Sequence, residues 1–288
     1  MEKQGVADVL KDYKIELAAA IILLSVMYFP TFRWLYKRWA EPGSNYGYIL
    51  MVPPVVVFLF WRMKTQLIGI RPAASRLGLW MLIPGTLLHI AARYLNINFI
   101  SGLSLPVTLM GSILYLFGKK MARRCLFPVL YLFFMVPIPV ITIRELNLKL
   151  KLFTAHWSAV TMSGLGIDVV EEGSFLHFPT GTLVVGNICS GLKYLIALIA
   201  FGALYAYIVE NSGLKRWVLF AASFPIAIAA NIVRIVALGL IANRWGIEAS
   251  DGAAHYLAGV FIFAVALTLL SALRGAMERF WPGSPRLT

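Results

Sequence analysis

Residues 217–240 read WVLFAASFPIAIAANIVRIVALGL, a run that contains one charged side chain, Arg234. A helix needs roughly 20 mostly apolar residues to cross the hydrocarbon core of a membrane, and this run meets that length. An ionisable group inside such a segment costs several kcal/mol unless it has a partner, so it is a functional candidate by default. The run therefore predicts a transmembrane helix that carries a residue of functional interest.

Seven further apolar runs predict an all-α integral membrane protein with about eight transmembrane helices in a single polytopic domain, residues 1–288. The other expected spans are 16–35, 46–62, 77–94, 102–118, 125–142, 188–209 and 253–273. The first is not expected to be a cleaved signal peptide, because it is long and lacks a small-x-small cleavage site.

The composition agrees with a membrane protein and argues against other classes. The chain has 288 residues, of which 60% are hydrophobic and 14% charged, whereas soluble domains are nearer half apolar and a quarter charged. A disordered chain would be poor in apolar residues. The net charge of +13 is divided into short groups between apolar runs, which is typical of cytoplasmic loops and predicts no nucleic-acid partner. Two cysteines make no disulfide scaffold.

The distribution of Lys and Arg predicts which side each loop faces. With both termini inside, the inner segments hold 16 Lys and Arg and the outer segments hold eight, a bias that favours cytoplasmic termini. Lys193 and Arg234 are the two that remain, and both fall within expected spans.

The longest outer segment, residues 143–187, is expected to be structured. Residues 145–163 mix leucines and aromatic residues with lysines, which favours an interfacial or re-entrant helix. A ninth span is the competing interpretation, but it would reverse every later element and spoil the charge bias. Short β-branched runs within 167–186, around Gly173 and Gly181, predict a small extracytoplasmic β-hairpin or meander.

This topology brings three chemically distinct residues to one depth of the membrane. Cys189 opens the inward-running sixth span, Arg234 lies in the outer third of the seventh, and His255 opens the eighth. A cysteine thiolate attacks carbonyl groups, histidine exchanges protons near neutral pH, and arginine can hold an oxyanion or a carboxylate. The set is typical of nucleophilic acyl transfer. Taken singly, each has a plainer interpretation: packing for the cysteine, an interfacial polar group for the histidine, and snorkelling for the arginine.

Other candidates are weaker. Cys125 is expected at the cytoplasmic side, a membrane thickness of about 30 Å from Cys189, so a disulfide is excluded. His89 is expected to make a buried hydrogen bond within the third span. His156 and His177 lie in the outer segment without an evident partner. Because zinc, P-loop, dinucleotide and G-x-S-x-G motifs are absent from the sequence, we expect no metal or cofactor.

Several motifs resemble those of the exosortases, within the exosortase/archaeosortase family of membrane transpeptidases. Cys189-Ser-Gly-Leu-Lys193 resembles the family's Cys-Ser-Gly-Leu-Arg block, Asn231-Ile-Val-Arg-Ile235 its Asn-x-x-Arg block, and His255 its single histidine. Residues 44–53 resemble its Ser-His-Gly segment, with Asn45 where His is usual. Phe127-Pro128 and the run 134–139, FMVPIP, resemble its Phe-Pro and Met-Val-Pro-x-Pro motifs. The resemblance covers about residues 44–270.

The resemblance implies a sortase-like cysteine transpeptidase. Cys189 would attack the scissile carbonyl and form an acyl-enzyme, Arg234 would stabilise the oxyanion, and His255 would protonate the leaving amine and activate the acceptor. The last two roles could be partly exchanged. Residues beside these three would bind the substrate: Asn187, Ser190, Gly191, Lys193 and Asn231. Two of them depart from the family pattern, because Glu is often found at the position of Asn187 and Arg at that of Lys193.

The resemblance also implies the partners and the location. The substrates would be exported proteins with a PEP-CTERM-like tail: a short motif, one transmembrane helix and a basic cluster. The enzyme would be a multi-pass protein of the cell inner membrane, in contact with lipid and with its active site on the periplasmic side. Two rival interpretations are a transporter or flippase of a glycan or lipid intermediate, and an O-acyltransferase-like enzyme that uses His255 without the thiol.

Overall fold

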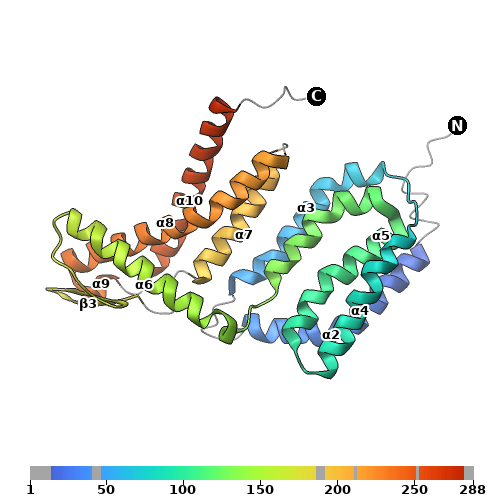
Figure 1. The fold of residues 1–288 in the computed structure, drawn as a ribbon, viewed down its shortest axis with the longest axis horizontal. Helices are drawn as coiled ribbons and strands as arrows, with labels where there is room; N and C mark the ends of the chain where they lie inside the picture. The colour runs from blue at the N-terminus through green and yellow to red at the C-terminus, as the bar shows by residue number, and fades with distance from the viewer. Residues whose placement is uncertain (1–13, 41–46, 186–191, 211–212, 251–252, 282–288) are drawn as a thin grey trace. The chain divides into compact units, whose positions relative to one another are not determined.

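The computed structural model describes residues 14–40, 47–185, 192–210, 213–250 and 253–281, most of which are helical (Figure 1). The chain divides into two compact units, residues 1–139 (unit 1) and 140–288 (unit 2), and each is described by itself. The apolar helices agree with a multi-pass membrane protein. The single domain expected from the sequence stays a prediction.

Unit 1 consists of helices in its described part. Its α-helices are α2 (Lys14–Ala40), α3 (Val52–Ile68), α4 (Leu79–Tyr94) and α5 (Asn98–Tyr131), and its 3-10 helices are η1 (Gly47–Met51), η2 (Arg76–Gly78) and η3 (Leu132–Met135). α4 lies along α5 at close range, because Gly111 of α5 faces the backbone of Leu82 and has no side chain to hold the helices apart. Small residues at such contacts are the usual means by which membrane helices approach closely.

A polar network joins α2, α4 and α5 inside this unit. His89 Nε2 donates to the carbonyl oxygen of Met27 (3.0 Å), so its Nδ1 is free to accept from the hydroxyl of Ser101 (3.0 Å). The hydroxyl of Tyr28 bonds to Ser104 (2.9 Å) and to Thr108. The buried hydrogen bond expected for His89 is confirmed. Since lipid offers no alternative partners, satisfied polar groups of this kind fix which helix faces meet.

Helix α5 bends sharply at Gly118, where two helical segments meet at φ +81° and ψ −177°. The connection before η2 fills this bend. The N–H of Ala73 donates to the carbonyl of Phe117 (3.2 Å), and the N–H of Ser75 donates to that of Tyr115 (3.1 Å). A Cβ atom at Gly118 would collide with the carbonyl oxygen of Ala73, so only glycine fits both the backbone conformation and the space.

The described part of the chain has five helices that are long and apolar enough to cross a membrane, compared with the eight expected. They contain residues 18–40, 49–68, 98–135, 213–245 and 257–280. The expected spans 102–118 and 125–142 fall largely within the one long segment that bends at Gly118. The expected span 77–94 corresponds to α4, which has 16 residues, and 188–209 to α7, whose described part is short. The count of eight stays a prediction.

Unit 2 is built around one long helix. Its elements are α6 (Val140–Gly164), β1 (Val170–Glu172), β2 (Phe175–Phe178), β3 (Gly181–Val184), α7 (Leu192–Val209), α8 (Gly213–Trp245), α9 (Ile247–Ser250) and α10 (Ala253–Phe280). α6, α7 and α10 all pack against α8 (Figure 1). The three strands form an antiparallel meander in the order β1-β2-β3, within the segment where a hairpin or meander is expected.

Two apolar clusters hold unit 2 together along α8. In one, Ala227 and Ala230 pack against Leu198 of α7 and Ile262 of α10. In the other, side chains of α6 and of the meander pack against Ile235 and its neighbours in α8. α6 turns small residues toward α8, while its large apolar side chains Leu146, Phe153, Trp157 and Val160 are exposed. A helix over residues 145–163 is therefore confirmed, and its position at the membrane interface stays a prediction.

We predict that Gly118→Ala destabilises the protein. A backbone conformation of φ +81° and ψ −177° is essentially restricted to glycine and costs an alanine about 1–3 kcal/mol, and the collision with Ala73 adds to that cost. Thermal unfolding in detergent should show a clear fall in the midpoint. Gly69→Ala is the matched control, because Gly69 has a helical φ of −80° and no atom within 4 Å of an added Cβ. Equal midpoints for the two variants would contradict the prediction.

Candidate functional site

The buried face of α8 carries the two polar residues of the expected Asn-x-x-Arg block. Arg234 has an exposed fraction of 0% and Asn231 of 2%. Asn231 follows directly on Ala230, which packs against Leu198 of α7 and Ile262 of α10, and Arg234 comes one helical turn after Ala230. The arginine is therefore enclosed by protein, as the sequence suggested for a charge within a span.

The starts of α7 and α10 lie at the same end of the helix group as the C-terminal part of α8, which carries Arg234. Short connections join α7 to α8 and α8 to α10, so the start of α7, the end of α8 and the start of α10 lie at one end of this group. Leu198, Ala230 and Ile262 share one cluster and mark a common level. At about 1.5 Å per residue, helix positions 193, 234 and 255 lie roughly 6 to 10.5 Å beyond that level. These helix positions are compatible with one level for positions 193, 234 and 255, and the common depth expected for Cys189, Arg234 and His255 stays a prediction.

The other predicted site residues are only partly described. Asn187, Cys189, Ser190 and Gly191 lie outside the described residues. Lys193 and His255 have described helix positions in α7 and α10, but their side chains lie outside the description. The distances that would join Cys189, Arg234 and His255 into one site therefore stay predictions.

In the sequence, Cys189 follows Val185 by four residues and precedes Leu192, the first residue of α7, by three.

The meander fixes the chain on the N-terminal side of Cys189. The N–H of Val185 donates to the carbonyl of Ser174 (2.8 Å), and the Val185 side chain is 1% exposed. The hydroxyl of Thr180 donates to the carbonyl of Ala242 in α8 (3.0 Å). These contacts fasten β3 to the helix that carries Arg234.

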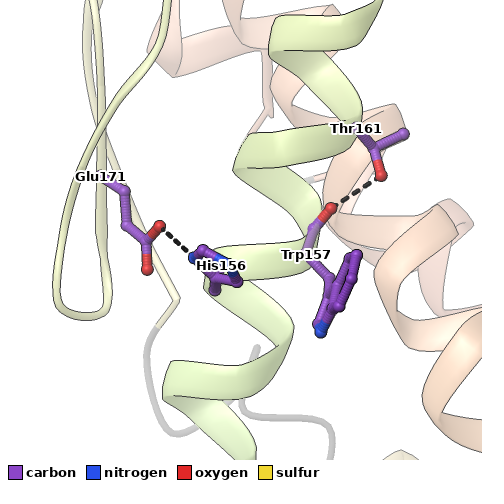
Figure 2. Close-up of polar contacts among 4 residues, drawn as sticks. All are labelled: His156, Trp157, Thr161 and Glu171. Atoms are coloured by element: carbon purple, nitrogen blue, oxygen red, sulfur yellow. Dashed lines mark hydrogen bonds and ion pairs between the residues drawn. The ribbon is translucent and has the colours of Figure 1, made fainter.

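Two histidines of the outer segment have partners that the sequence did not reveal. Figure 2 shows His156 of α6 directed toward Glu171 of β1, with its Nδ1 at 2.9 Å from a carboxylate oxygen. His177 bonds to the hydroxyl of Thr182 (2.8 Å) and lies 3.3 Å from the carboxylate of Glu172. The interpretation that they lack partners was wrong. The pair of His156 with Glu171 arises where α6 lies against β1, and His177 meets Thr182 across the β2–β3 register.

The remaining candidates are a metal site and Cys125. Within the described residues, no group of three or more His, Cys, Asp and Glu could hold a metal ion. Cys125 is buried in an apolar cluster with Met110, Ala122 and Val129, which agrees with a packing role. What the site offers chemically is a permanent positive charge, enclosed in a low-dielectric environment where it interacts strongly with a developing anion.

The chain matches the model of a known protein family. The model described as transmembrane exosortase (Exosortase_EpsH) matches residues 39–272, which is most of the chain and includes every predicted site residue. No curated protein and no solved structure gives a significant match.

We predict that Asn231→Leu leaves the folded protein as stable as the wild type or makes it more stable. Both polar atoms of the amide are buried and have no hydrogen-bond partner among the described residues. Replacing such a group with an apolar one of similar size removes a desolvation penalty of about 1–3 kcal/mol. The measurement is the midpoint of thermal unfolding in detergent.

Ser104→Ala is the control for this prediction, because the Ser104 hydroxyl bonds to Tyr28 and its loss leaves a buried group with fewer partners. Its midpoint should fall. A fall of similar size for Asn231→Leu would contradict the prediction that burying this amide costs stability.

Proposed function

The chain belongs to the transmembrane exosortase family, and on that premise we propose that it is a membrane cysteine transpeptidase. It cleaves the C-terminal sorting tail of exported proteins and transfers the remaining chain to an acceptor. The observation that carries the proposal is the complete burial of Arg234, toward the end of the helix group where α7 and α10 begin. A permanently charged side chain enclosed within a transmembrane segment is a functional candidate by default.

In the proposed reaction, Cys189 is the nucleophile. Its thiolate attacks the scissile carbonyl carbon and forms a tetrahedral intermediate with a negative oxygen. The intermediate collapses to a thioester as the C–N bond breaks, and the released amine takes a proton from His255. An acceptor amine or hydroxyl, or water, then gives its proton to His255 and attacks the thioester carbonyl, and the Cys189 thiolate leaves as the C–S bond breaks.

Arg234 stabilises the oxyanion in this scheme. Its guanidinium remains charged throughout the reaction and is held by α8, so no reorganisation is needed when the negative charge develops. A helix in a packed core holds a donor more rigidly than a loop does. Asn187, Ser190, Gly191, Lys193 and Asn231 are proposed to bind the substrate chain beside the scissile bond.

The proposed substrate matches the topology of the enzyme. A tail made of a recognition motif, one transmembrane helix and a basic cluster would insert with its basic end at the cytoplasmic face. Its scissile bond would then lie at the outer face, on the periplasmic side of the inner membrane. The excess of Lys and Arg in the expected inner segments supports this orientation, with Cys189 on the outer side.

We predict that Cys189→Ala and Cys189→Ser both abolish processing of a co-expressed exported protein that carries such a tail. Neither residue can form the thioester, so the processed form should fall at least about 100-fold, as judged from the shift in apparent mass. Cys125→Ser is the control and should process normally, because Cys125 is packed in unit 1. Wild-type processing by the Cys189 variants would eliminate the transpeptidase and leave a transporter as the better interpretation.

We predict that Arg234→Lys lowers the rate of processing about 10²–10³-fold, the usual effect of losing one oxyanion donor. Lysine keeps the charge but lacks the planar fork of donors. Arg244→Lys is the matched control, since Arg244 lies on the same helix and is exposed. If both variants process at equal rates, the assigned role of Arg234 is wrong.

A further inference from the structure

The edge of β3 that faces away from β2 carries hydrogen-bonding groups that the sheet does not use. β2 and β3 pair as Phe178 with Gly181 and Leu176 with Leu183, and Val185 bonds to Ser174. In an antiparallel pair, hydrogen-bonded and non-hydrogen-bonded residue pairs alternate along the strands. The two-residue connection begins and ends at the hydrogen-bonded pair Phe178 and Gly181, and the bond between Val185 and Ser174 fits the same alternation. The N–H and C=O groups of the intervening residues therefore point away from the sheet.

The two intervening residues are Thr182 and Val184. Both are exposed. Among the described residues, no backbone hydrogen bond outside the sheet involves either of them. The edge thus offers two donors and two acceptors, spaced two residues apart, to an extended chain.

The opposite edge of the meander, on β1, is less suited to pairing with another chain. On β1 the residue with outward-facing backbone groups is Glu171, and its carboxylate is bound to His156 of α6 (2.9 Å). Two glutamates in a three-residue strand also discourage pairing with another chain. The residues of β3, GTLV, carry no charge. Of the two edges, β3 is the one suited to pairing.

The free edge leads directly to the proposed nucleophile. After Val184 the chain passes through the buried Val185 and reaches Cys189 four residues later. A strand paired with β3 would lie about 4.8 Å from it, and each of its residues would advance about 3.3 Å. Because Cys189 comes only four residues after Val185 in the sequence, a substrate segment on this edge would be close to the scissile bond along its own chain.

We propose that the substrate segment next to the scissile bond binds as an added strand on the free edge of β3, at Thr182 and Val184. This inference rests on the proposed function and specifies how the enzyme holds its substrate. Main-chain hydrogen bonds provide the affinity, and the exposed side chains beside the edge provide selectivity. Val184 is paired with Phe175, and both are exposed on the same face of the sheet, where they can contact apolar side chains of the substrate.

The first test is photo-crosslinking in the full-length Cys189→Ala variant, which would leave the substrate uncleaved. A photoreactive phenylalanine replaces Thr182 or Val184, and the probe is a co-expressed exported protein with a C-terminal transmembrane helix and basic tail. Mass spectrometry should locate both crosslinks just before that helix, at residues two positions apart, because strand residues pair one to one. Val170 is the control: it is exposed on the same face but on β1, two strand spacings away.

The second test removes one hydrogen-bond donor of the edge. Val184→Pro should fold, because proline is tolerated where the N–H points away from a sheet. It should lower processing at limiting substrate at least tenfold and abolish the crosslink from position 182. Val184→Thr keeps the N–H and the β-branched shape, so it should retain the crosslink from position 182 that Val184→Pro abolishes.

Several results would overturn the inference. They are equal crosslinking from Val170, crosslinks from β3 to a second copy or to the chain's own residues, and full processing by Val184→Pro. Failure of the proposed function is recognised separately, because the Cys189→Ala variant would then still process the probe. Loss of processing in that variant without crosslinks from β3 would overturn the docking mode alone.

Discussion

A guanidinium remains charged at any pH that a protein meets, so the burial of Arg234 in α8 constrains everything around it. The charge is enclosed by protein within a helix that is long and apolar enough to cross a membrane. On the N-terminal side of Arg234, α7 and α10 pack against α8 through alanines, Leu198 and Ile262. On its C-terminal side, α6 and the meander pack against Ile235 and its neighbours in α8. The architecture of unit 2 therefore does two tasks at once: it excludes water and lipid from the arginine, and it brings the starts of two other helices to the same end of the helix group.

Much of this arrangement could be predicted from the sequence because the bilayer imposes simple rules of length and charge. The apolar runs, the helix over residues 145–163 and the β-rich segment after it all correspond to described elements. The hydrogen bond of His89 followed from the cost of leaving an imidazole unsatisfied among apolar helices. For the site, one position inside an apolar run identified Arg234 as exceptional, and its burial agrees.

The features that escaped prediction depend on contacts between distant parts of the chain. The bend at Gly118 is stabilised by the connection near Ala73, and no local pattern around Gly118 identifies that partner. The pairing of His156 with Glu171 depends on the register of the meander and on how α6 lies against it. Thr180 reaches α8 across 62 residues of sequence. Composition and periodicity describe single elements, whereas these contacts arise only when the elements meet.

The bond between Thr180 and Ala242 has a mechanical consequence. It couples β3 to the end of α8, the helix that also holds Arg234. A shift of α8 along its axis would carry the meander with it, so the strand that leads toward Cys189 and the guanidinium would move together as one rigid part. If the protein acts as proposed, α7 and α10 are the helices whose movement would let a substrate tail enter or leave without shifting this part.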